Sequence, residues 1–185
     1  MKCKSCGYEL SGNERFCGNC GEPVQQAAEQ NKKKYINIGH PIGYTKINNQ
    51  IVYLVDNGMQ QVQLPQEVFA EWAKMPQETP NEDDIVILEK TDCTLNVKDT
   101  AQSRRFMNCI PCRQGFGAAH EGKHAVVLGH TPVLITENQM IVWRLADGKN
   151  TLTRIGVMAG MEEWDVMDAV WELVGYDLVY LKFAR

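Results

Sequence analysis

Six of the seven cysteines in this chain occur in Cys-x-x-Cys pairs, and two of these pairs, Cys3/Cys6 and Cys17/Cys20, lie near the N-terminus. A Cys-x-x-Cys turn presents two thiolates on one side of a metal ion, and four thiolates complete the tetrahedron that Zn²⁺ prefers. The glycine after each pair supplies the positive φ that such a turn needs. This segment has almost no large apolar side chains, so metal binding must supply its folding free energy. We therefore predict one structural zinc ion without an open position for catalysis.

The same segment resembles the short bacterial zinc-ribbon modules found at protein N-termini. Those modules read Cys-x-x-Cys-Gly, an aromatic residue, and then Cys-x-x-Cys-Gly, and Phe16 before Cys17 fits the pattern. The resemblance covers residues 1–24. It implies a stable zinc-binding unit and does not imply an activity.

A second group of candidate metal ligands consists of Cys109, Cys112, His120 and His124. The Cys-x₂-Cys and His-x₃-His spacings suit zinc, although the gap between the pairs is shorter than in common zinc fingers. Glycines within and after this gap would let the loop bend around an ion. Cys93 could replace one histidine, although a lone cysteine is more often a small buried core residue. The sequence thus predicts one zinc ion, or two if this second cluster also binds metal.

Two other interpretations of Cys109 and Cys112 stay open. Proline before the second cysteine also occurs in dithiol oxidoreductases, in which a helix after the first cysteine lowers its pKa. However, Arg113-Gln114-Gly115 is a poor helix start, and no strand leads directly into Cys109. The third interpretation is a loop with two thiols and two solvated histidines. We interpret His40 and His130, each after a glycine, as structural.

The composition is that of a soluble globular protein. The chain has 185 residues, 44% of them hydrophobic and 23% charged, with a formal net charge of -4. This charge argues against binding nucleic acid or anionic membrane by bulk electrostatics. No apolar stretch approaches the length of a membrane span, and no secretory signal begins the chain. The number of cysteines is odd, and most of them occur in Cys-x-x-Cys pairs, which favours metal ligation in a reducing compartment. We therefore expect a cytoplasmic protein.

We expect an α+β fold: a small N-terminal zinc ribbon, then a mixed α/β body that ends in a winged-helix-like domain. The expected divisions are the ribbon at 1–24, a polar linker at 25–34, an α+β segment at 35–128 and the winged-helix-like domain at 129–185. Hydrophobic periodicity and turn signals predict the elements. The predicted strands span 50–55, 59–64, 85–88, 125–128 and 178–183, with a hairpin turn at 56–58. The predicted helices span 65–74, 137–145, 152–158 and 162–174, the last burying Trp164, Met167, Trp171 and Val174 on one stripe.

A faint internal repeat links two of these segments. The pattern Val62-x-Leu64-Pro65-Gln66-x-x-Phe69-x-x-Trp72 matches Val133-x-Ile135-Thr136-Glu137-x-x-Met140-x-x-Trp143. Each is a strand end, a helix start and two apolar residues one turn apart. Any junction between a strand and an amphipathic helix tends to look similar, so the pattern supports only a weak prediction of two related halves.

The run from Pro132 to Phe183 resembles the small winged-helix modules typified by PqqD, which hold peptide precursors for modifying enzymes. The residues that carry this resemblance are Leu134 to Glu137, Val142 to Thr151, Ile155, Leu173 and Leu178 to Leu181. The resemblance implies a winged helix that binds a peptide. Winged-helix transcription factors share these residue types, so the function has to be argued from the surface.

The predicted third helix of this region argues against DNA. It carries Glu162, Glu163, Asp165, Asp168 and Glu172, with no lysine or arginine from Met161 to Gly175. A helix that enters the major groove normally supplies cations to the phosphates. We therefore expect a non-enzymatic zinc-binding adaptor that binds a protein or peptide partner. The alternatives are a DNA-binding regulator that uses the ribbon and Lys32-Lys33-Lys34, and a thiol oxidoreductase that uses Cys109 and Cys112.

Overall fold

The computed structural model describes residues 2–3, 5–9, 16–21, 33–76, 80–120 and 122–184, without the side chain of His120. The chain forms two compact units, Met1–Lys33 and Lys34–Arg185, which are the ribbon and the body. Most of the predicted linker at 25–34 lies outside the described residues. None of the helices in the described part of the chain could span a membrane.

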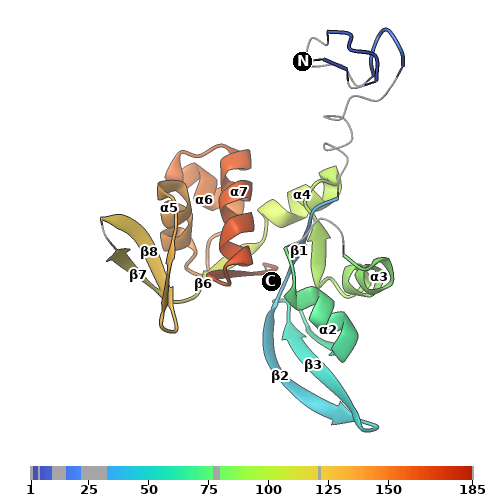
Figure 1. Cartoon of the computed structure of the whole chain (residues 1–185). Coiled ribbons are helices and arrows are strands. Elements are labelled where there is room, and N and C mark those ends of the chain that lie inside the picture. The colour runs from blue at the N-terminus through green and yellow to red at the C-terminus, as the bar shows by residue number, and fades with distance from the viewer. Residues whose placement is uncertain are drawn as a thin grey trace. The chain divides into compact units, whose positions relative to one another are not determined.

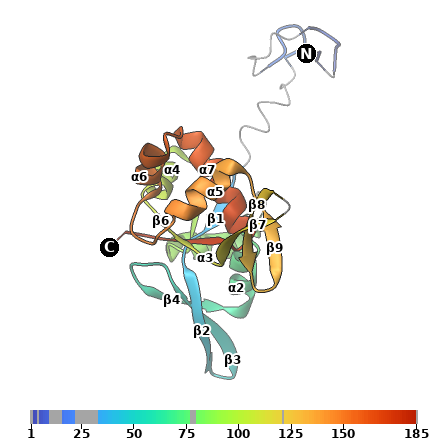
Figure 2. The ribbon, with the colours of Figure 1, turned by 90° about the vertical axis from the view of Figure 1, so that its left-hand side faces the viewer.

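In the part of the first half that the structure describes, the chain forms five strands and two helices. β1 (Tyr35–Asn37) pairs antiparallel with β5 (Thr94–Asn96). The chain between these two strands forms the three-stranded antiparallel sheet β2–β3–β4 and the helices α2 and α3. The bounds are His40–Ile47 for β2, Gln50–Asp56 for β3, Gln61–Pro65 for β4, Gln66–Ala73 for α2 and Glu82–Lys90 for α3. This sheet extends away from the helices of the second half (Figures 1 and 2).

α4 (Thr100–Met107) leads into the second half, which repeats this arrangement with one additional helix. β6 (Ile110–Arg113) pairs antiparallel with β10 (Val179–Lys182), and β7–β8–β9 form a three-stranded antiparallel sheet. α5, α6 and α7 lie between β9 and β10 in the chain and pack against one another (Figure 1). The bounds are Phe116–His120 for β7, Lys123–Leu128 for β8, Thr131–Leu134 for β9, Glu137–Leu145 for α5, Leu152–Ala159 for α6 and Glu163–Gly175 for α7.

The local geometry of the two halves repeats in detail. Gly39 and Gly115 each precede the first strand of a three-stranded sheet, and both have positive φ, +114° and +73°. A Cβ on Gly39 would meet Val55 Cγ1 at 2.5 Å, and a Cβ on Gly115 would meet Val127 O at 2.4 Å. Asp92 and Asp177, which follow α3 and α7, have φ of +55° and +57°. The two halves therefore correspond element by element: β1 to β6, β5 to β10, α2 to α5 and α3 to α7. This correspondence includes the repeat predicted from residues 62–72 and 133–143.

The body contains two clusters of buried apolar residues. The smaller cluster lies in the first half and includes Val55, Leu64, Trp72 and Leu88. The larger cluster contains Ile36 and Phe106 from one side of residue 128 and the helices of the second half from the other. β8 and β9 also pair directly across that residue. The larger core and the β7–β8–β9 sheet therefore both include residues on either side of the expected division between 128 and 129.

The segment predicted as a strand at 85–88 is a helix. Asn81 accepts hydrogen bonds from the backbone N–H groups of Asp83 and Asp84, and thus caps α3. Three acidic residues in the first turn complement the helix dipole. Ile85 and Leu88 are buried one turn apart, whereas Val86 and Ile87 are exposed. The sequence suggested a strand because four consecutive apolar residues do not reveal which of them are buried one helical turn apart.

The three predicted C-terminal helices are confirmed within about one residue. Thr136 and Gln139 form a capping box at α5, and Gly160 ends α6 in the left-handed conformation. The predicted buried stripe of α7 is partly wrong, because Trp164 is 62% exposed. The buried side of α7 instead consists of Val166, Met167, Ala169, Val170, Leu173 and Val174. The winged-helix-like assignment of this region stays a prediction.

Candidate metal centre and body pocket

The four ribbon cysteines lie together as predicted. The Sγ atoms of Cys3, Cys6, Cys17 and Cys20 all lie within 4.8 Å of one another. Cys3 Sγ is 3.7 Å from Cys20 Sγ, and Cys6 Sγ is 3.5 Å from Cys17 Sγ. A tetrahedral ion with Zn–S bonds of about 2.3 Å separates its sulfurs by about 3.8 Å. The four thiols therefore have the number and spacing that a tetrahedral metal ion requires.

The backbone around each pair explains how the cysteines are positioned. Gly7 and Gly21 follow the two pairs, and each has a φ of +72°. Their N–H groups donate to the carbonyl oxygens of Cys3 and Cys17, respectively. Cys3 also donates its backbone N–H to Tyr8 O at 2.8 Å. The predicted glycine conformations are confirmed, and they close the two cysteine turns.

One ligand is electrostatically prepared for metal binding. Hydrogen bonds from the Tyr8 backbone and, second, from the Asn19 side chain lower the pKa of Cys6 from 9.0 to about 6. Burial opposes this shift of the Cys6 pKa, and hydrogen bonds from Cys20 and Cys17 add to it more weakly. A thiolate is the form of cysteine that coordinates metal. The lowered pKa of Cys6 thus favours the form that binds metal.

Of the second predicted cluster, the described side chains Cys109, Cys112 and His124 do not form a converging group of ligands, and the side chain of His120 lies outside the described part of the structure. Cys109 follows α4 and Cys112 lies in β6, and both are buried. His124 is exposed on β8, in a different sheet, and the backbone of His120 ends β7. Among the described side chains, the ribbon cysteines are the one group of three or more potential metal ligands whose ligand atoms converge.

Cys109 has the environment of a core thiol. It is inaccessible to solvent, and its Sγ donates to Arg105 O at 3.4 Å. Burial raises the pKa of Cys109 to about 12, and the nearby Arg105 charge offsets this only in part. Cys93 is similar, because burial raises its pKa to about 11. A redox-active cysteine needs a lowered pKa, so the shift at Cys109 is in the opposite direction.

The acidic residues of α7 are on its exposed side. Glu162, Glu163 and Asp165 are exposed at the start of the helix, and Asp168 and Glu172 are exposed further along. Trp164 lies among them, with Lys98 Nζ at 5.2 Å from its ring centroid. We call these six residues from Glu162 to Glu172 the α7 face. It combines five carboxylates with one exposed aromatic ring.

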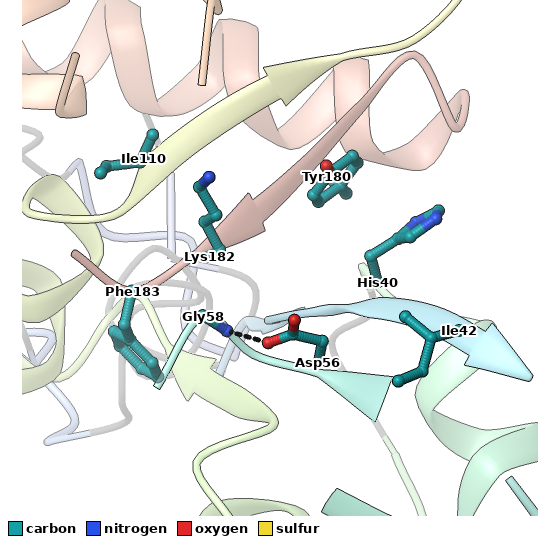
Figure 3. A pocket seen from close by; sticks show the side chains of 8 residues that line it. All are labelled: His40, Ile42, Asp56, Gly58, Ile110, Tyr180, Lys182 and Phe183. Atoms are coloured by element: carbon teal, nitrogen blue, oxygen red, sulfur yellow. Dashed lines mark hydrogen bonds between the residues drawn. The ribbon is translucent and has the colours of Figure 1, made fainter. Parts of the chain in front are cut away.

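A pocket of about 440 Å³ lies where the first sheet meets the β6–β10 pair (Figure 3). We call it the β2–β10 pocket. The His40 and Tyr180 rings stack on one another with centroids 4.6 Å apart. Asp56 accepts a hydrogen bond from the Gly58 N–H at 2.8 Å. Its lining consists of His40, Ile42, Asp56, Gly58, Ile110, Tyr180, Lys182 and Phe183.

Sequence reasoning missed this pocket. His40 was interpreted as structural, and Asp56, Tyr180 and Lys182 were assigned to a turn and a strand. His40 and Asp56 come from the consecutive strands β2 and β3, whereas Tyr180 and Lys182 come from β10, more than 120 residues further along the chain. No local motif connects them. They come together only because β10 packs beside the first half. In this packing the Gly39 N–H donates to Leu181 O, and the Phe183 N–H donates to Asn57 O.

Comparison with known proteins identifies the N-terminal unit only. A family model described as a zinc-ribbon domain matches residues 2–24. No curated protein and no solved structure shows a significant match to the chain. The N-terminal unit is thus a zinc-ribbon domain with four clustered cysteines, joined to a mixed α/β body.

Proposed function

We propose that this protein is a non-enzymatic zinc-binding adaptor whose body binds a protein or peptide partner. The observation that carries the proposal is the α7 face. Glu162, Asp165 and Asp168 are among its five exposed carboxylates, and the described residues from Met161 to Gly175 include no lysine or arginine. Such a face favours a basic partner segment, and the exposed Trp164 ring offers it apolar area.

The ribbon supports the adaptor role because all four of its metal positions are protein ligands. A zinc ion bound by four thiolates has no open coordination position for a substrate or a catalytic water. Its contribution is the folding free energy of a segment with almost no apolar core. The ribbon therefore adds a second rigid recognition unit to the chain.

The order of elements in the second half is compatible with the proposed winged helix. A strand, three helices and a closing strand follow one another, and the resemblance to PqqD-like modules would imply a peptide partner. That resemblance rests on common residue types, so the α7 face carries the argument.

A DNA-binding regulator is the first alternative. Carboxylates on α7 would repel phosphates, and a DNA-binding helix normally offers several cations instead. The remaining basic candidates are the ribbon and Lys32-Lys33-Lys34, of which Lys32 lies outside the described residues. Band-shift assays at near-physiological salt test this alternative. Submicromolar, sequence-dependent binding that survives removal of residues 1–34 would replace the adaptor proposal.

A thiol oxidoreductase is the second alternative, and the environment of Cys109 argues against it. A thiol with a pKa near 12 is almost entirely protonated at neutral pH. Thiol–disulfide exchange requires the thiolate. The protein should therefore fail to reduce insulin disulfides, and turnover abolished by Cys109→Ser would make it an enzyme.

The adaptor proposal is tested by recovering the partner from the native host and measuring its binding to purified variants. Asp165→Lys together with Asp168→Lys should weaken binding about tenfold, with a stronger effect at low salt. The matched control is Glu67→Lys together with Glu82→Lys, which makes the same charge change on exposed positions of α2 and α3. Equal effects of the two double variants would contradict a specific role of the α7 face.

A further inference from the structure

The β2–β10 pocket contains two charged side chains, Lys182 and Asp56, that the core of the body does not need. Lys182 leaves β10 on the same face as Tyr180, because residues two apart in a strand share a face. The Lys182 side chain is half-buried, and within the described part of the chain its Nζ has no ion-pair or hydrogen-bond partner. An ammonium group in a partly desolvated site without a partner attracts an anion more strongly than one in bulk water.

Asp56 contributes the opposite charge from the other wall of the pocket. One of its carboxylate oxygens, Oδ1, accepts the Gly58 N–H, and Oδ2 has no hydrogen-bond partner among the described residues. Asp56 and Lys182 are not joined by an ion pair, although both line the same hollow. The pocket therefore offers an anion site and a separate acceptor for a positively charged or N–H donor group.

The walls between these two groups are aromatic and aliphatic. The stacked rings of His40 and Tyr180 form one side (Figure 3). Ile42, Ile110 and Phe183 supply apolar surface nearby. A volume of about 440 Å³ is within the range of small-ligand sites, and a few placed polar groups on apolar walls are typical of them.

The repeat in the body provides an internal comparison. The positions that correspond to His40 and Asp56 in the second half are Phe116 and Val127. The positions that correspond to Tyr180 and Lys182 in the first half are Leu95 and Val97. All four polar groups of the pocket thus have apolar counterparts. The repeated framework folds without them, which indicates that they serve a different purpose at this place.

We propose that the β2–β10 pocket binds an α-amino or α-amido carboxylate, the chemistry that a free amino acid and the carboxyl terminus of a peptide share. The ligand carboxylate pairs with the Lys182 ammonium. The adjacent ammonium or amide N–H of the ligand donates to Asp56, and its side chain packs against the His40–Tyr180 stack. A phosphate dianion fits less well, because one lysine must balance both its charge and the Asp56 carboxylate. This site is separate from the α7 face, so either proposal can fail alone.

The test uses the zinc-loaded full chain and follows backbone amide NMR signals of Gly58 and Lys182. The probes are an equimolar mixture of free amino acids, a Gly-Gly-Xaa-Xaa peptide library with a free carboxylate, and the same library amidated at its carboxyl end. The free-carboxylate library, the amino-acid mixture or both should shift these signals, and the amidated library should not. Whichever of the two carboxylate probes binds more tightly identifies the source of the ligand.

Variants assign the binding to the named groups. Lys182→Met keeps the aliphatic stem and should weaken binding about tenfold or more, because it removes a charge-assisted hydrogen bond. Asp56→Asn keeps the acceptor for the Gly58 N–H and should weaken binding several-fold. Lys149→Met, at an exposed loop position, is the control and should have no effect. The proposal is overturned if no carboxylate probe shifts the signals, if the amidated library binds equally, if Lys182→Met binds normally, or if inorganic phosphate binds more tightly.

Discussion

Trp72 and Trp143 occupy equivalent positions in the two halves of the body and make the same hydrogen bond. Trp72 Nε1 donates to Ile38 O at 3.3 Å and also to Cys93 O at 3.0 Å, and Trp143 Nε1 donates to Gln114 O at 3.0 Å. The Ile38 and Gln114 carbonyls each belong to the second residue before the first strand of a three-stranded sheet. Both indole rings are buried. The helix after each sheet is thus fixed to the strand entry by one buried tryptophan.

Replacing either tryptophan should therefore destabilise the body. Trp72→Phe and Trp143→Phe each leave a carbonyl unsatisfied and a cavity behind, so the free energy of unfolding should fall by about 2 kcal/mol or more. Trp164→Phe, on the exposed α7 face, should change it by less than about 0.5 kcal/mol. Urea unfolding of the three variants measures this. A Trp164→Phe variant as unstable as the other two would contradict the packing described.

The two glycines before the sheets make a second test of the repeat. Gly39→Ala and Gly115→Ala would place a Cβ within 2.5 Å of existing atoms, so each should cost at least about 3 kcal/mol of unfolding free energy or prevent folding. Gly129→Ala is the control, because Gly129 also has positive φ but no atom lies within 4 Å of its Cβ position. It should cost only about 1 kcal/mol of backbone strain. Equal costs at Gly115 and Gly129 would contradict the close approach.

Part of this fold could be predicted from the sequence because local signals determine it. The Cys-x-x-Cys-Gly spacing predicted the ribbon ligands, and apolar periodicity predicted α5 and α6, whose ends the capping box at Thr136 and the left-handed Gly160 determine. The repeat was visible at residues 62–72 and 133–143, where apolar spacing is shared. It was hidden elsewhere because the first sheet has longer strands and α6 has no counterpart among the described residues of the first half.

The remaining differences come from tertiary packing. Ile85 to Leu88 has the composition of a strand, but Asn81 and the acidic first turn start a helix there. Trp164 fits the apolar spacing of α7, yet the core contacts a neighbouring stripe and leaves this ring exposed. The pocket residues His40, Asp56 and Lys182 carry no local signal, since they meet only when β10 packs against the first half.

Alkaline pH should destabilise the body through its buried thiols. Burial raises the pKa of Cys109 from 9.0 to about 12, so between these values the folded state holds a proton that the unfolded state has lost. The free energy of unfolding should be unaffected by this group below pH 9 and should fall above it, by up to about 1.4 kcal/mol per pH unit. Cys109→Ser should show a shallower decline from pH 9 to 11 and the same slope as the original from pH 7 to 8.5. Parallel curves over the whole range would show that Cys109 is not buried as described.

The metal content of the purified full chain tests the central claim most directly. Elemental analysis of protein prepared without added metal should find about one zinc ion per chain, because the ribbon cysteines are the one group of potential ligands that converges among the described side chains. Cys17→Ser should lose this zinc, whereas Cys93→Ser and the Cys109→Ser/Cys112→Ser double variant should keep it. Substantially less than one zinc ion per chain, or zinc that Cys17→Ser retains, would contradict a zinc ribbon held by Cys3, Cys6, Cys17 and Cys20.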